Sequence, residues 1–229
     1  MIVVYVNSME DTATFDAIYS NLNEDTIILH NPTRAEVDAI LIERPTETLL
    51  CFGHGSPRGL FSHDFKGMLI DAESVPLLVD REMIGIWCYA SNFGIAHNLR
   101  GFFTYMFISN QQECVFNRCG WFDNEVIFAE NRLFAERVNE LIRNETPLEN
   151  WVEILYESRN ADLPFVEFNY GNLSYLDGEG TPQLIVEEED NIRFAESYLF
   201  EDEEVTENEE DIDWKEFFQE LRNCDDFSQ

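Results

Sequence analysis

Short, uninterrupted apolar runs alternate with segments of helical periodicity over the first 180 residues, and this alternation constrains the fold more than any other feature. Strands without polar alternation are buried on both faces, which is typical of parallel strands joined by crossover helices. The sequence therefore predicts an α/β fold with a mostly parallel central sheet. We expect its strands at residues 2–6, 26–30, 48–52, 84–87, 102–108 and 165–170.

Helical spacing of apolar residues falls between these runs. The helix after the second strand is expected to begin behind Thr33, whose hydroxyl can cap the first turn. Residues 109–121 are rich in polar side chains and predict an irregular loop, with a substrate-recognition wall or a processing site as the functional alternatives. We expect helices at residues 10–22, 34–43, 75–80, 92–99, 124–143 and 147–159.

The chain has 229 residues, of which 45% are hydrophobic and 14% aromatic, so it can bury a substantial core. Its 46 acidic and 14 basic side chains give a formal net charge of −32. That charge disfavours nucleic acid and anionic membranes as partners and favours a basic protein. No run approaches the ~18 apolar residues of a membrane span, and the N-terminus lacks a basic flank, so we expect a cytoplasmic protein.

The five cysteines are odd in number and lack the paired spacing of a zinc ribbon. This pattern indicates neither a disulfide framework nor a metal site, and we expect no cofactor. Cys114 and Cys119 are near enough in sequence to pair with each other. Cys51 lies inside an expected strand, where a cysteine usually packs as a small hydrophobic side chain.

Composition changes after about residue 180. Residues 187–229 hold 18 acidic and 3 basic side chains, a net charge of −15. We therefore expect one domain over residues 1–180 and an acidic, partly helical or disordered tail over residues 181–229. Two interpretations of the tail's apolar residues stay open: short helices that dock on the domain, or a partner-binding or autoinhibitory segment.

Two of the expected strands end on one reactive side chain each, His54 after the third and Cys88 after the fourth. The carboxyl ends of parallel strands meet at one edge of a sheet, where open α/β folds place their sites. A thiol at neutral pH needs a base to become a nucleophile, so His54 beside Cys88 predicts a cysteine nucleophile with its base. The alternative for Cys88 is structural, because a lone cysteine at a strand end is more often a buried hydrophobic residue. The alternative for the base is His63.

The order of these segments resembles the caspase-like cysteine peptidases of clan CD, and most closely their bacterial CHAT-type branch, shared with separases. The resemblance covers roughly residues 1–180 and implies a three-layer α/β/α sandwich. It rests on Gly53-His54-Gly55-Ser56, Gly67-Met68-Leu69-Ile70-Asp71, Trp87-Cys88-Tyr89-Ala90-Ser91, the helix near residues 122–141, and Phe168-Asn169-Tyr170 with Leu176-Asp177-Gly178.

The resemblance also implies a catalytic dyad without a third member. His54 would generate the Cys88 thiolate and then protonate the leaving amine. The backbone N–H groups of Gly55 and Cys88 would hold the oxyanion, and losing one such donor typically costs ~3 kcal/mol of transition-state stabilisation.

Substrate preference is expected to differ from that of caspases. Caspases carry Gln-Ala-Cys at the nucleophile, and the glutamine helps to form a pocket for aspartate, whereas this chain has Ile86-Trp87-Cys88. The acidic composition favours a basic or neutral residue before the scissile bond instead. The side chains expected in loops near the site are Asp64, Glu113 and Asp123.

The sequence thus predicts a cysteine endopeptidase that cleaves protein substrates, with an activating or inhibitory protein as a further partner. The resemblance implies that it serves a bacterial regulatory or defence pathway. The alternative is a catalytically silent caspase-like adaptor that binds a basic protein through its acidic tail. Reactivity of Cys88 that depends on His54 would distinguish the two.

Overall fold

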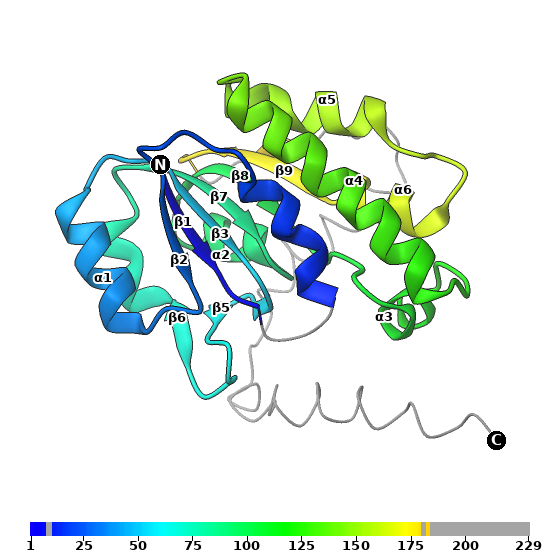
Figure 1. Ribbon diagram of the computed structural model, residues 1–229, viewed down its shortest axis with the longest axis horizontal. Coiled ribbons are helices and arrows are strands. Elements are labelled where there is room, and N and C mark those ends of the chain that lie inside the picture. The colour runs from blue at the N-terminus through cyan, green and yellow to red at the C-terminus, as the bar shows by residue number, and fades with distance from the viewer. Residues whose placement is uncertain (8–10, 180–181, 184–229) are drawn as a thin grey trace. The chain divides into compact units, whose positions relative to one another are not determined.

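The computed structural model describes residues 1–7, 11–179 and 182–183 (Figure 1). Most of the acidic tail expected over residues 181–229 lies outside this range, as does Cys224.

Seven strands form one sheet, which holds the centre of the molecule (Figure 1): β1 (Ile2–Tyr5), β2 (Ile27–His30), β3 (Leu49–Phe52), β7 (Glu82–Ile86), β8 (Arg100–Thr104), β9 (Leu173–Asp177) and β10 (Pro182–Gln183). Their order is β10-β9-β8-β7-β3-β1-β2. Five of these strands are parallel, namely β1, β2, β3, β7 and β8, whereas β9 runs antiparallel to β8 and β10 antiparallel to β9. The expected α/β fold with a mostly parallel sheet is confirmed.

Helices cover both faces of the sheet, because successive strand residues point to opposite sides. Val3, Leu50 and Ile84 lie in one buried cluster, which η1 and α4 cover in Figure 1. Val4, Cys51 and Met83 lie in the other. The first layer consists of η1 (Asp11–Tyr19), α4 (Asn124–Arg143), η3 (Leu148–Asn150), α5 (Trp151–Ser158) and α6 (Pro164–Gly171), and the second includes α1 (Arg34–Glu43), η2 (Ala72–Leu77) and α2 (Ala90–Ala96).

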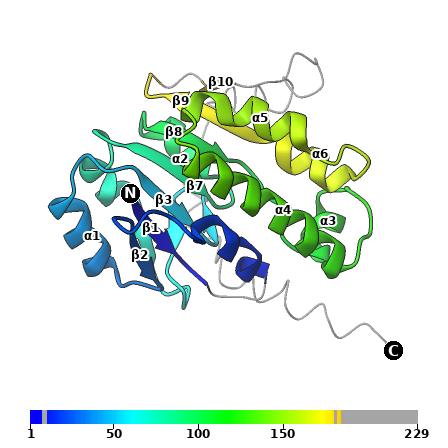
Figure 2. The same ribbon diagram turned by 45° about the horizontal axis from the view of Figure 1, so that its top comes forward.

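The parallel strands start at the end of the sheet where the N-terminus lies and finish beside a second, smaller sheet (Figures 1 and 2). That sheet is antiparallel and has the order β4-β5-β6. It joins the second layer, since Leu60 and Ile70 pack in the same cluster as α1 and α2. Its strands are β4 (Gly55–Ser56), β5 (Gly59–Phe61) and β6 (Met68–Ile70).

The sequence predicts only a loop between β3 and η2, so these strands correct that expectation. Two further corrections concern helices. Residues 165–170, expected as a strand, form most of α6, because Pro164 starts a helix well and Phe165, Val166, Asn169 and Tyr170 recur at helical spacing on its buried side. The loop expected over residues 109–121 contains α3 (Gln111–Phe116), which Asn110 caps.

Other expected elements have shifted ends. The strand expected at residues 102–108 is β8 and ends at Thr104, so residues 107–108 belong to the loop after it. The first expected helix is the 3-10 helix η1, and the last two strands of the sheet, β9 and β10, were not expected as strands. Helix α4 spans the expected residues 124–143, since its buried apolar side chains recur every three or four positions.

Thr33 begins α1 with a capping box. Its hydroxyl accepts the Glu36 N–H at 3.3 Å, and the Glu36 carboxylate accepts the Thr33 N–H at 2.8 Å. Two N–H groups that the helix leaves unpaired are thereby satisfied.

We expect Thr33→Ala to lower the free energy of unfolding by about 1 kcal/mol, because the cap is lost. Thr33→Ser keeps the hydroxyl and serves as the control, with stability close to that of the parent protein. Urea denaturation followed by circular dichroism measures both. Equal losses in the two variants would show that the hydroxyl does not stabilise α1.

Candidate active site

His54 lies two residues beyond the end of β3, and Gly53 makes the turn between them. Gly53 has φ +150°, and a Cβ built on it would lie 2.8 Å from the Cβ of Val6. A side chain at this position would be strained, so glycine lets the chain leave the strand sharply. The Gly53 N–H still donates to the carbonyl of Ile86 at 3.2 Å, which extends the pairing of β3 with β7.

The β5–β6 hairpin covers His54. The backbone carbonyl of His54 accepts the Phe61 N–H at 3.0 Å, and the centroid of the His54 ring lies 5.8 Å from that of Phe65 in the hairpin turn. The Phe65 ring also lies 5.9 Å from Phe61. His54 is consequently only 5% exposed, and aromatic contacts on one side restrict the orientation of its imidazole.

Cys88 occupies the sharp turn between β7 and α2. Tyr89 has φ +66°, in the left-handed region, and the Ala90 N–H closes the turn on the Trp87 carbonyl at 3.2 Å. A non-glycine residue in this conformation costs on the order of 1 kcal/mol, and such residues concentrate at functional sites. The Cys88 side chain is partly exposed, and its Sγ lies 3.9 Å from the carbonyl oxygen of Phe107.

The register of two adjacent strands puts His54 and Cys88 at the same level. β3 and β7 are parallel neighbours in which Phe52 pairs with Ile86, and each candidate follows its paired residue by two positions. Neighbouring strands lie about 4.8 Å apart, so the two turns leave the sheet side by side. The structure therefore brings the two predicted catalytic residues to the carboxyl ends of adjacent strands.

The other described cysteines are poor candidates for a nucleophile. Cys51, Cys114 and Cys119 are buried and free, so the pairing considered for Cys114 and Cys119 does not form. Burial raises the pKa of the Cys51 and Cys114 thiols, and it raises the pKa of Cys119 to about 11. Since the thiolate is the reactive form, Cys88 is the best placed thiol within the described residues.

Two buried amides hold the loop that approaches Cys88. The Ile108 N–H donates to Asn169 Oδ1 at 2.7 Å, and the Ile108 carbonyl accepts from Asn169 Nδ2 at 3.0 Å and from Asn131 Nδ2 at 3.1 Å. The preceding Phe107 packs on Phe134 of α4, with ring centroids 4.9 Å apart. The carbonyl beside the Cys88 thiol is thus anchored to the helical layer.

Glu113, expected in a loop as a substrate contact, lies in α3 and is 4% exposed. Its carboxylate accepts the Ser109 N–H at 2.7 Å and the Ser109 hydroxyl at 2.9 Å. This carboxylate therefore holds the loop before α3, and the expectation that it faces substrate from a loop is wrong.

Asp64 is exposed in the β5–β6 turn, next to Phe65, which contacts His54. Hydrogen bonds from the Ser62 hydroxyl and from Lys66 lower the pKa of this carboxyl, so it is ionised at neutral pH. Lys66 Nζ lies 3.1 Å away and competes with any substrate cation. His63, the second candidate base, is exposed in the same turn and follows no strand of the central sheet.

Asp123 is exposed at the start of α4, where its side chain makes no capping hydrogen bond. It belongs to the connection after α3, whereas Asp64 belongs to the hairpin over His54. The two exposed carboxylates therefore belong to different layers, and only Asp64 is adjacent to a residue that contacts a candidate catalytic group.

The sequence analysis missed most of the side chains that support the two candidates. The small sheet had a signal, because Gly55 and Gly59 flank the Pro-Arg turn that joins β4 to β5. Nothing in the sequence marks the amides of Asn131 and Asn169 as buried, since asparagine is mostly a surface residue. Phe65, Phe107 and Asn131 were not singled out, whereas Trp87 and Asn169 stand in motifs of the resemblance without a supporting role assigned to them.

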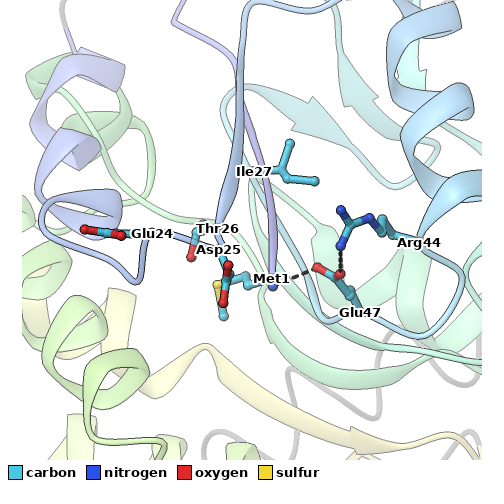
Figure 3. Close-up of a pocket in the computed structure, with 7 residues that line it drawn as sticks. All are labelled: Met1, Glu24, Asp25, Thr26, Ile27, Arg44 and Glu47. Carbon is cyan, nitrogen blue, oxygen red and sulfur yellow. Dashed lines mark hydrogen bonds and ion pairs between the residues drawn. The ribbon is translucent and has the colours of Figure 1, made fainter.

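A pocket lies elsewhere, at the amino ends of β1 and β2 (Figure 3). Within it, Glu47 accepts from the Met1 amino group and from Arg44, each at 2.9 Å. The Met1 amino group and Arg44 are therefore already paired with a carboxylate. The pocket lies at the start of the strands, away from the turns that carry His54 and Cys88. Its lining residues are Met1, Glu24, Asp25, Thr26, Ile27, Arg44 and Glu47.

The chain matches no protein-family model and no curated protein. Among the described residues, no group of three or more His, Cys, Asp or Glu side chains could hold a metal ion. None of the helices in that part of the chain is both long and apolar enough to cross a membrane.

We expect Asn169→Leu to lower the free energy of unfolding by ~2–3 kcal/mol, because it leaves the buried Ile108 N–H without its acceptor. The control is Asn160→Leu, since the amide of Asn160 makes an exposed hydrogen bond to Glu130. That change should stay within about 0.5 kcal/mol. Urea denaturation measures both, and similar losses would rule out the proposed anchoring by Asn169.

Proposed function

We propose that this protein is a cysteine endopeptidase in which Cys88 is the nucleophile and His54 its general base. One observation carries the proposal: Phe52 pairs with Ile86 in adjacent parallel strands, so the two side chains follow at equivalent positions on one edge of the sheet. The partly exposed Cys88 and the buried Cys51, Cys114 and Cys119 add support, because a nucleophile must be reached by substrate.

In this proposal His54 takes the thiol proton and Cys88 Sγ attacks the scissile carbonyl carbon, forming a C–S bond and an oxyanion. Collapse of this intermediate breaks the C–N bond, and the imidazolium gives its proton to the departing amine. Water, deprotonated by His54, then attacks the thioester and releases the second product with the thiol restored. Every proton moves through one side chain.

The proposed oxyanion donors are the backbone N–H groups of Gly55 and Cys88. Gly55 follows His54 directly and opens β4, while Cys88 follows Trp87 in the adjacent turn. In this proposal both N–H groups face the substrate carbonyl from neighbouring turns. One such donor commonly contributes ~3 kcal/mol to transition-state stabilisation.

The family that we propose is the caspase-like peptidases, in the CHAT-type and separase-like branch. The support is the order of motifs along the chain, with His-Gly after one strand of a parallel sheet and cysteine after its neighbour. A bacterial regulatory or defence role, and an activating or inhibitory partner, follow from the same resemblance.

The proposed preference is for a basic or neutral residue before the scissile bond. Asp64 supports it, because this ionised carboxylate lies beside the Phe65 that touches His54. The chain also has Ile86-Trp87-Cys88 where caspases have Gln-Ala-Cys, so the glutamine of the aspartate pocket is missing. The ion pair of Asp64 with Lys66 makes the expected effect modest.

Limited treatment of the native protein with iodoacetamide, followed by peptide mapping, tests the dyad. We expect Cys88 to be labelled first and His54→Ala to slow that labelling at least tenfold, since the base that generates the thiolate is gone. His63→Ala is the matched control, because His63 is exposed in the neighbouring hairpin. Labelling of Cys88 that is indifferent to His54 would refute the peptidase and favour the adaptor.

Fluorogenic peptides that differ only in the residue before the reporter test the preference. We expect hydrolysis after Arg or Lys, abolished by Cys88→Ala, and a kcat/KM for the Arg peptide lowered up to about fivefold by Asp64→Asn. Asp80→Asn is the control, because Asp80 is exposed before β7, at the opposite edge of the sheet. Cleavage only after acidic residues would contradict the proposed preference.

A further inference from the structure

Trp87 precedes Cys88, and its side chain connects the two turns of the candidate site. It is 2% exposed and packs in the cluster that holds α1, α2 and the small sheet. Its indole Nε1–H donates to the backbone carbonyl of Ser56 at 3.3 Å. Ser56 stands two residues after His54, so this hydrogen bond crosses from the cysteine turn to the histidine turn.

The indole also lies against Gly55. A Cβ built on Gly55 would lie 2.2 Å from Trp87 Cδ1 and 2.6 Å from its Cγ, so the ring occupies the space that any larger residue would need. Gly55 allows this approach because it has no side chain. The segment that carries one proposed oxyanion donor therefore rests directly on the residue before the nucleophile.

The other end of Trp87 is held by the neighbouring strand. Its backbone carbonyl accepts the hydroxyl of Thr104 at 2.8 Å, and Thr104 is fully buried at the end of β8. A buried hydrogen bond of this kind is costly to break, so the backbone just before Cys88 has little freedom. Trp87 is thus restrained by β8 on its main chain and by β4 on its side chain.

We infer that Trp87 is a positioning residue, which sets the separation of the histidine turn from the cysteine turn; the inference rests on the proposed function. Its side chain is 2% exposed and is not one of the proposed reacting groups. Displacements near 1 Å between reacting groups can cost on the order of a hundredfold in rate, so a contact that joins the two turns directly controls the efficiency of the dyad.

The test compares Trp87→Phe with Trp151→Phe in the full chain. Trp151 is equally buried, and its indole also donates to a backbone carbonyl, that of Thr146 at 2.9 Å, but it lies in the other layer. Both variants remove the indole hydrogen bond of a buried tryptophan, although the bond of Trp151 is only partly buried, and both should lower stability. Only Trp87→Phe is expected to slow alkylation of Cys88 and to lower kcat, each by roughly tenfold, with KM within about twofold.

Thr104→Val provides a second route, because it removes the hydroxyl that holds the Trp87 carbonyl and leaves the indole in place. Thr104→Val should also lower both the rate of Cys88 alkylation and kcat. Suppose that labelling of Cys88 depends on His54 in the parent protein, but that Trp87→Phe and Thr104→Val leave the labelling rate and kcat as Trp151→Phe leaves them. That result overturns the inference about Trp87, and the proposed peptidase stands. Labelling that does not depend on His54 in the parent protein overturns both.

Discussion

The parallel pairing of β3 with β7 is the interaction on which the rest of this molecule depends. It sets Phe52 opposite Ile86 and so decides which residues meet beyond the strand ends. A shift of one residue would reverse the face of every side chain in the moved strand. Residues of the two buried clusters would then exchange sides, and the two turns would no longer leave the sheet at one level.

The candidate site draws its support from both layers that cover the sheet. Over His54 stands the β5–β6 hairpin, which packs with α1 and α2. Beside Cys88 runs the loop after β8, which Asn131 and Asn169 hold to α4 and α6. The two supports share no residues, and the contact of Trp87 with Gly55 and its hydrogen bond to Ser56 join the two turns that they support.

Most elements of the sheet could be predicted because each is short, apolar and followed by a turn. The errors have a common cause: local pattern does not show what a segment packs against. Residues 165–170 are rich in aromatic side chains, which favour strands. They nevertheless form most of α6, because Phe165, Val166 and Tyr170 then share one buried face of the helix. The small sheet from Gly55 to Ile70 was not predicted because its strands have only two or three residues each.

By itself, the sequence determined the alternation of strands and helices, the parallel sheet and the two strand ends that carry His54 and Cys88, because periodicity and turn residues are local properties. Only the tertiary structure decided that β3 and β7 are neighbours, that Glu113 binds its own loop and that Trp87 reaches Ser56. These depend on hydrogen bonds and packing between residues far apart in the chain, where each partner's identity is set by the fold and not by its own neighbours.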